Sequence, residues 1–226
     1  EARLNNFEAG SFSETTTAAF TVEGMLGSTD DDDATVDDAV AAGYSFQIDL
    51  NTSFTGEDSL DISIDAGSAG TEGIAEFDGN GEGDDLHVDG VSYTFPVGDK
   101  TTVIVGADTD GSALFTTACV YGGPGNMLDD CANVNAGITG GGATVGAAYD
   151  FGTGLTAAFG AQTTEAAVFT DESQDAYAFN TAYTGDNYGV SITYSVVENS
   201  GVTNEDTYTA FNAYYLPEGS NLPSVS

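Results

Sequence analysis

The stretch YSFQIDLNTSFTGEDSLDISIDAG, residues 44–67, decides the fold of this chain. Its first limb alternates, with Tyr44, Phe46, Ile48 and Leu50 on one side and polar residues on the other. After a short turn at residues 55–58, the second limb repeats the alternation. Because β-strand side chains alternate with period two, the stretch predicts an antiparallel hairpin with an apolar face and an acidic face. In a soluble protein the apolar face would pack in a core and the acidic face would meet water. In a membrane barrel the apolar face would meet lipid and the acidic face a water-filled lumen. The fold depends on which of these two environments the faces meet.

The composition restricts the partners of the chain. Among 226 residues, 37 are acidic and 2 are basic, so the formal net charge is −35. Binding to nucleic acid depends on Lys and Arg, and we therefore exclude nucleic acid as a partner. Small cations are the expected partners. No cofactor is required, and acidic loops such as the run from Asp30 to Asp33 are expected to hold Ca²⁺ or other divalent cations only loosely.

The same alternation recurs along the chain. Thirty glycines and a composition rich in Thr, Tyr and Phe favour strands and turns over long helices. Residues 1–13 form a lead-in without a clear period, and residues 14–226 form one β domain. We expect ten strands and the start of an eleventh, with the ten at residues 15–26, 44–51, 60–66, 88–97, 101–106, 144–151, 155–163, 177–183, 188–196 and 207–216.

The connections between these strands are of two kinds. Tight turns at about 56, 99, 153, 185 and 219 alternate with long acidic loops at about 32, 76, 125, 170 and 202. Aromatic residues gather beside the tight turns, namely Phe54, Phe95, Phe151, Tyr183, Tyr188 and Tyr215. Short turns at one end, long loops at the other and a girdle of aromatics are typical of an outer-membrane β-barrel. The alternative is a soluble antiparallel β-sandwich, because its strands also have one apolar face.

Four segments resemble one family of barrels. They are NTSFTGEDSLDISIDAG (51–67), VSYTFPVGDKTTVIVG (91–106), TTACVYGGPGNMLDDC (116–131) and TVGAAYDFGTGLTAAFG (144–160). These segments resemble the barrel domain of cyanobacterial outer-membrane porins, the group labelled iron-uptake porins that includes the major porins of marine unicellular cyanobacteria. The likeness extends over nearly the whole chain.

The resemblance implies an all-β, antiparallel transmembrane barrel of the porin type. It implies a homotrimer in the lipid of the outer membrane, at the cell surface, that passes small solutes and inorganic ions by diffusion. Complete members hold peptidoglycan through an N-terminal domain that this sequence lacks. Because the sequence also stops inside an expected strand, we expect a partial porin whose ten or eleven strands belong to a larger barrel, incomplete at its C-terminus.

The charge pattern suggests a mechanism for such a channel. If the apolar faces point to lipid, the polar faces line the lumen, with Glu23, Gln47, Asp49, Asn51, Asp61, Ser63 and Asp65 as the lining residues. A pore lined by carboxylates concentrates cations and excludes anions. In salt like that of seawater the Debye length is about 4 Å, so only carboxylates close to the narrowest point of the pore contribute to its preference for cations. The alternative role for these acids is to keep an exposed face soluble. For the whole chain, the alternative function is a secreted or surface structural protein, such as an adhesin, a filament subunit or a virion decoration protein.

The longest irregular stretch, residues 108–142, contains both cysteines. Two cysteines in an exported chain favour a disulfide between Cys119 and Cys131, which would stabilise the fold by about 3 kcal/mol in the chain-entropy model. A metal site is disfavoured because no histidine lies nearby. We also consider the hypothesis that this loop folds inward and narrows the pore.

Two further patterns bear on metal binding and catalysis. Asp78, Asn80, Glu82 and Asp89 partly follow a Ca²⁺-binding loop, although Glu replaces the usual third ligand and no flanking helices are expected; a flexible Gly-rich loop is the alternative. The single histidine, His87, has no nucleophile beside it in the sequence and is expected at the surface. With no phosphate-binding loop and no distinct acid–base pair, we do not expect an enzyme.

Overall fold

The chain folds into β-strands joined by turns and irregular segments. The computed structural model describes residues 16–28, 40–69, 79–81, 83–119, 138, 142–164, 168, 170, 174–198 and 205–217. Ten strands and no helix lie in these ranges. The strands are β1 (Thr16–Gly27), β2 (Ala41–Thr52), β3 (Ser59–Gly67), β4 (His87–Val97), β5 (Thr101–Ala107), β6 (Ala143–Asp150), β7 (Leu155–Thr163), β8 (Asp175–Thr184), β9 (Tyr188–Glu198) and β10 (Glu205–Tyr215).

The strands form one antiparallel sheet in chain order, from β1 to β10, with each strand hydrogen-bonded to the next. β1 and β10 stand at the two ends of this order, so the sheet is not closed and the expected barrel remains a proposal. The chain divides into two compact units whose boundary lies inside β4, between Val91 and Ser92. The first unit contains β1–β3 and the second contains β5–β10.

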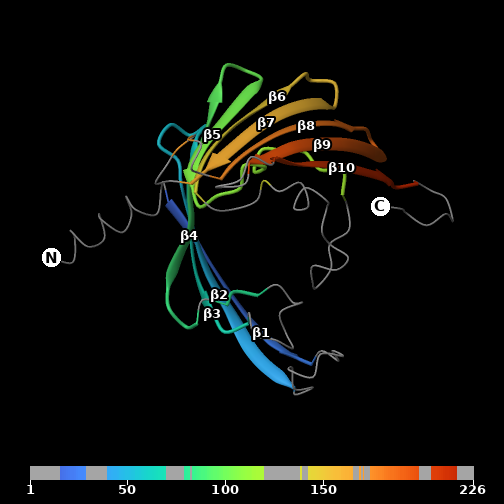
Figure 1. Ribbon diagram of the computed structural model, residues 1–226. Helices are drawn as coiled ribbons and strands as arrows, with labels where there is room; N and C mark the ends of the chain where they lie inside the picture. The colour runs from blue at the N-terminus through green and yellow to red at the C-terminus, as the bar shows by residue number, and fades with distance from the viewer. Residues whose placement is uncertain are drawn as a thin grey trace. The chain divides into compact units, whose positions relative to one another are not determined.

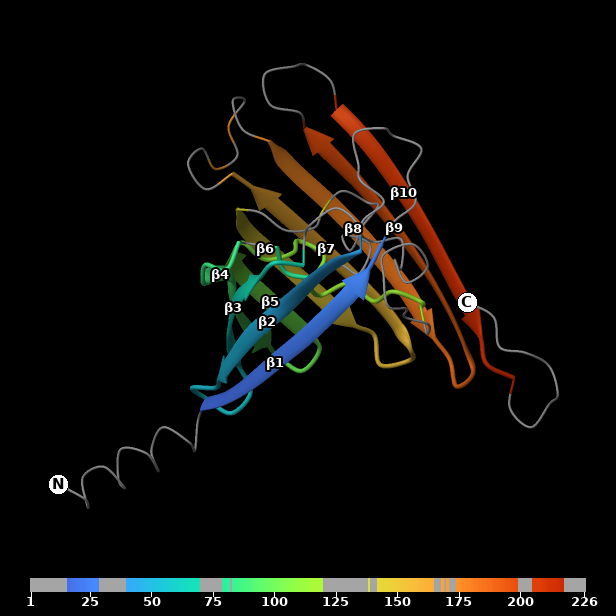
Figure 2. The same cartoon turned by 90° about the horizontal axis from the view of Figure 1, so that it is seen from below.

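In the first unit, β1, β2 and β3 lie side by side (Figure 2). Their register places apolar residues opposite one another in continuous rows. One row joins Phe20, Ile48 and Ile64, and the next joins Val22, Phe46 and Ala66. The hairpin of β2 and β3 therefore has the apolar face and the polar face that the sequence predicts.

The tight turn between β2 and β3 is organised by one carboxylate. Asp58 is buried, and its Oδ1 accepts hydrogen bonds from Ser53 Oγ at 2.8 Å, Phe54 N at 3.0 Å, Thr55 N at 2.7 Å and Thr55 Oγ1 at 2.8 Å. Gly56 then takes the left-handed conformation, with φ of 88°, which a residue with a side chain rarely adopts. The turn is thus specified by polar side chains and one glycine.

We expect Asp58→Ala to lower the free energy of unfolding by about 2–3 kcal/mol, because it leaves several donors in the turn without their acceptor. All four bonds end on one oxygen, so Asp58→Asn retains an acceptor and should cost clearly less. Urea-induced unfolding of the two variants and the parent protein measures both values. If Asp58→Ala and Asp58→Asn lower the free energy of unfolding equally, the side-chain oxygen at position 58 does not hold the turn.

In the second unit, β6–β10 form a curved layer of neighbouring strands (Figure 1). The tight turns of this unit are hydrogen-bonded to one another. Lys100 Nζ donates to Phe151 O at 3.1 Å, Asp150 N donates to Lys100 O at 2.9 Å, and Thr184 N donates to Gly154 O at 2.9 Å. The turns that follow β4, β6 and β8 therefore lie at one end of this layer, as the alternation of short and long connections predicts.

Aromatic rings meet beside these turns. Tyr149 and Phe151 pack edge to face with their centroids 4.8 Å apart, and Tyr183 and Tyr188 stack at 5.6 Å. The predicted clustering of aromatics at the tight-turn end is confirmed for Phe151, Tyr183 and Tyr188.

The buried apolar side chains of the described residues are mostly small. They are alanines together with Ile104, Ile138 and Val197, whereas no Phe, Tyr or Leu of the described ranges is among them. A small cluster in the second unit joins Ile138, Ala176, Ala178 and Val197, with Phe115 packed against it. The core is therefore built from residues that let backbone segments approach closely.

The ten predicted strands are confirmed, with ends that differ by at most a few residues. The turn expected near residue 219, the start of an eleventh strand and the lead-in lie outside the described residues. Within the described ranges, no helix has the length and apolar character needed to cross a membrane.

Candidate functional site

The register of β1–β3 brings the seven predicted lining residues onto one face, which we call the polar face. Three rows cross it: Thr21–Gln47–Asp65, Ala19–Asp49–Ser63 and Thr17–Asn51–Asp61. Glu23, opposite Ser45, belongs to the same face. Pairing across three strands thus gathers residues that are up to 42 positions apart in the sequence, from Glu23 to Asp65.

Neutral side chains orient the carboxylates of the polar face. Gln47 Nε2 donates to Asp49 Oδ1 at 2.8 Å and to Ser63 Oγ at 3.2 Å, and Ser63 Oγ donates to Asp49 Oδ1 at 3.2 Å. Asn51 Nδ2 donates to Asp61 Oδ1 at 2.5 Å. In the described part of the first unit there is no Lys or Arg, so these bonds hold the acids in place without neutralising their charge. The polar face therefore keeps a negative field.

In the second unit, residues 108–119, here called the inner loop, cross one face of the sheet strand by strand. Thr144 Oγ1 of β6 donates to Thr109 O at 2.6 Å, and Gly111 N donates to Gln162 Oε1 of β7 at 3.3 Å. We call this face the inner face.

The crossing continues over the next two strands. Thr116 N donates to Asn180 Oδ1 of β8 at 3.1 Å, and Ala118 N donates to Ser191 Oγ of β9 at 3.0 Å. The inner loop is therefore fixed to four strands in succession.

Small residues on the inner face make room for this loop. A side-chain carbon at Gly160 would overlap the carbonyl oxygen of Gly111, and the ring of Phe115 lies 3.4 Å from the same position. Neighbouring inner-face residues are Ala178, Thr193 and Ser195, each at most 1% exposed. The inner face is therefore lined by small and polar side chains that lie beneath the chain's own loop.

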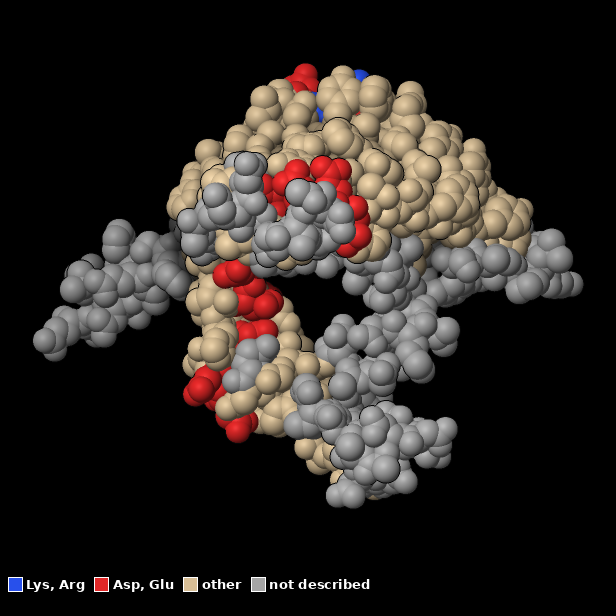
Figure 3. Space-filling model, in the orientation of Figure 1, with Lys and Arg blue, Asp and Glu red and all other residues tan. Residues whose placement is uncertain are grey.

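The opposite face of the second unit, the outer face, carries large apolar side chains that are exposed. Phe211 is 69% exposed and Phe179 is 60% exposed. The register places the following exposed residues on this face: Val105, Val145, Tyr149, Leu155, Phe179, Tyr188, Val190, Ile192, Tyr194, Phe211 and Tyr215. Towards the long-loop end, however, Ala161, Thr163 and Asp175 of this face are covered. Figure 3 shows wide stretches of the second unit's surface without a charged side chain.

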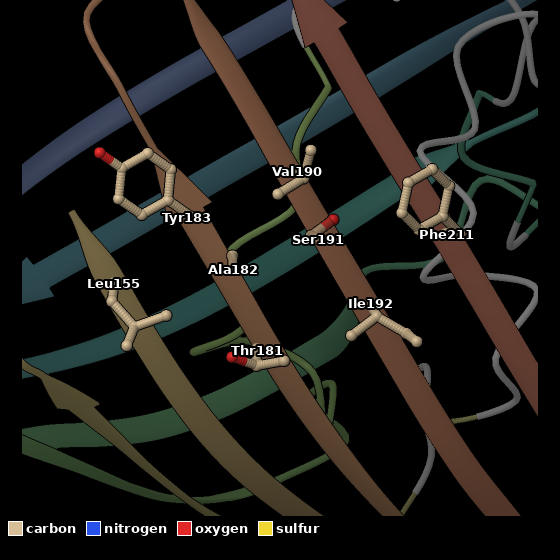
Figure 4. A pocket seen from close by; sticks show the side chains of 8 residues that line it. All are labelled: Leu155, Thr181, Ala182, Tyr183, Val190, Ser191, Ile192 and Phe211. Carbon is tan, nitrogen blue, oxygen red and sulfur yellow. The ribbon is translucent and has the colours of Figure 1, made fainter.

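A shallow groove of ≈ 290 Å³ lies on the outer face. Figure 4 shows Leu155, Tyr183, Ile192 and Phe211 standing around it, on β7, β8, β9 and β10. No charged side chain lines this groove, and its surface is mainly apolar.

Two of the four predicted Ca²⁺ ligands, Asn80 and Asp89, lie in the described part of the chain, so the site stays a prediction. Asp78 and Glu82 lie outside the described residues, and Asp89 lies on β4. Asn80 has a structural role, because its backbone N donates to Ser45 Oγ at 3.2 Å and its Nδ2 donates to Phe46 O at 3.1 Å. No group of three or more His, Cys, Asp or Glu that could hold a metal occurs among the described residues.

The other residues singled out from the sequence have simpler positions. Cys119, at the end of the described inner loop, is not a free thiol, and Cys131 lies outside the described residues, so their pairing stays a prediction. His87 is exposed at the first position of β4.

Sequence reasoning missed the side chains that hold the inner loop, namely Thr144, Gln162, Asn180 and Ser191. A signal was present, because Asn180, Ser191, Thr193 and Ser195 alternate with large apolar residues on β8 and β9. The predicted lining residues all lie on the first three strands, where the acids are dense. Compared with known proteins, the chain matches no family model and no curated protein.

Proposed function

We propose that this chain forms part of an outer-membrane β-barrel channel through which small solutes and inorganic ions diffuse. The observation that carries the proposal is the distribution of side chains in the second unit. Large apolar residues are exposed on the outer face, whereas small and polar residues lie on the inner face under the chain's own loop. Outer-membrane barrels have this arrangement, with an apolar band toward lipid and a polar interior.

A water-soluble sheet would require the reverse distribution. Burial of apolar surface contributes about 25 cal/mol per Å², so a soluble protein covers its large apolar residues first. Here the segment that covers the sheet lies on the inner face and leaves residues such as Phe179 and Phe211 exposed. Lipid would satisfy these side chains, and the groove beside Phe211 would take part of an acyl chain.

The tight-turn aromatics support the same placement. Tyr and Phe are common where a barrel meets the membrane–water boundary, because their rings are apolar and the tyrosine hydroxyl is polar. Tyr149, Tyr188 and Tyr215 of the outer face lie near one end of the strands. They would mark one boundary of the apolar band, with Phe179 and Phe211 deeper in it.

The passage would prefer cations. The polar face carries Glu23, Asp49, Asp61 and Asp65 without a neutralising base among the described residues of the first unit. A carboxylate about 4 Å from an ion contributes about 1 kcal/mol even in water, which is about a fivefold difference in local concentration. The inner loop would narrow the passage from the side of β6–β9.

The experiment that tests this function is planar-bilayer conductance of the refolded, purified protein with a KCl gradient across the membrane. Discrete conductance steps with a reversal potential on the cation side are expected. Failure to insert, combined with monodisperse behaviour in detergent-free buffer, would reject the channel in favour of a secreted or surface structural β-protein.

A further inference from the structure

The inner loop is held to the sheet of the second unit by hydrogen bonds. Backbone N–H groups of the loop donate to side-chain oxygens of the strands. We infer that Asn180 and Ser191 are positioning residues that hold the inner loop against the inner face and thereby set the width of the passage. The attachment itself follows from the geometry of this unit, and its effect on width rests on the proposed function.

Asn180 is built into the sheet as an acceptor for the loop. It is 3% exposed, its Oδ1 accepts from Thr116 N at 3.1 Å, and its Nδ2 donates to Thr193 Oγ1 at 2.9 Å. The second bond fixes which end of the amide faces the loop, because the nitrogen is engaged by the next strand. The oxygen therefore stays directed at Thr116.

Ser191 repeats this arrangement one strand further on. It is 2% exposed, and its Oγ accepts from Ala118 N at 3.0 Å. Together the two side chains satisfy the backbone N–H groups of alternate loop residues, 116 and 118, which belong to no strand. A buried donor that loses its acceptor costs about 1–3 kcal/mol, so the loop's position depends strongly on these two acceptors.

Apolar packing alone would hold this part of the loop weakly. Phe115 packs against a small cluster of Ile138, Ala176, Ala178 and Val197. The inner face between the attachment points offers mainly alanine methyl groups and hydroxyls, which provide little apolar area. The hydrogen bonds therefore decide where the loop rests.

The test compares the parent protein with Asn180→Leu/Ser191→Ala, which removes both acceptors at similar volume. Asn180→Asp retains an oxygen acceptor for Thr116 N and should keep the attachment. The matched control is Thr181→Val, a neighbouring position of β8 whose side chain bonds Thr156 O and not the loop. Gly160→Ala is a second probe, since its methyl group would displace the loop at Gly111 without weakening a strand.

The first measurement is amide hydrogen exchange of the peptide spanning 112–118, by mass spectrometry of the full chain in lipid. In the double variant, exchange at Thr116 and Ala118 should accelerate by about tenfold or more, whereas Asn180→Asp and Thr181→Val should match the parent. Unchanged exchange in the double variant would overturn the inference. Equal acceleration in Thr181→Val would also overturn it, since the loop would then respond to any change in β8.

The second measurement is single-channel conductance of the same preparations. The double variant and Gly160→Ala should conduct roughly 1.5-fold less than the parent, because a loop that leaves the inner face moves into the passage. Faster exchange with unchanged conductance would refute the effect on width. If no preparation conducts, the parent included, while exchange still differs as expected, the proposed function fails and the attachment stands.

Discussion

Replacing Phe211 by arginine is expected to destabilise the protein folded in a lipid bilayer by about 2–4 kcal/mol. Phe211 lies on the outer face of β10, is 69% exposed, and stands beside the groove opposite Ile192. If lipid covers this face, a guanidinium near the middle of the apolar band must lose its hydration or distort the bilayer. Urea titration of protein folded in vesicles, read by heat-dependent migration on a gel, measures the loss.

The matched control is Asn212→Arg, the neighbouring position on the inner face of the same strand. In a channel this side chain would reach toward water, so the variant should fold with a loss well below that of Phe211→Arg. In a soluble protein, a substitution at an exposed position such as Phe211 would change the free energy of unfolding by no more than about 0.5 kcal/mol. Near-neutral Phe211→Arg would therefore contradict the membrane placement.

The strands were predictable from the sequence because their signal is local. Alternation along the hairpin of residues 44–67 determines which side chains share a face, and pairing between neighbouring strands follows from short turns such as that at Asp58. The predicted polar face of β1–β3 needed only this information. Strand ends were less certain, as in β2, which begins at Ala41 because Ala41–Gly43 also pair with β1.

The path of the inner loop could not be predicted in this way. Thr116 and Asn180 are 64 positions apart, and Ala118 and Ser191 are 73 apart, so no periodic pattern relates them. The residues that bond the loop are also chemically ordinary: an Asn, a Gln and a Ser that accept from it, and a Thr that donates to it. Their role appears only when the fold places them under a segment with unsatisfied backbone donors.

The Ca²⁺ pattern illustrates a different limit. Asn80 fits a ligand position by spacing, and in the fold its backbone N donates to Ser45 and its Nδ2 donates to Phe46 of β2, while the Ca²⁺ site itself stays a prediction. A polar residue in a Gly-rich loop can serve the backbone of a nearby strand as readily as a cation, and spacing alone does not distinguish the two. The burial of the residue and its hydrogen-bond partners distinguish these two roles, and both depend on the tertiary structure.

Neutralising the polar face is expected to reduce the cation preference of the channel. The triple variant Glu23→Gln/Asp49→Asn/Asp61→Asn retains acceptor oxygens for the donors Gln47 and Asn51, so the hairpin should keep its network. Because a carboxylate at about 4 Å contributes about 1 kcal/mol in water, we expect the cation-to-anion permeability ratio to fall by roughly threefold or more at about 0.1 M salt. The measurement is the reversal potential in a KCl gradient.

Salt and a second carboxylate provide the controls for this prediction. At about 1 M salt the Debye length is about 3 Å, so the difference between parent and triple variant should shrink. Glu57→Gln removes one acid from the exposed tight turn between β2 and β3, away from the polar face, and should leave the reversal potential near that of the parent. An equal shift per removed charge for Glu57→Gln would mean that net charge, rather than the placement of acids on the polar face, sets the selectivity. A triple variant with the parent's reversal potential at low salt would show that the polar face of β1–β3 does not border the ion path.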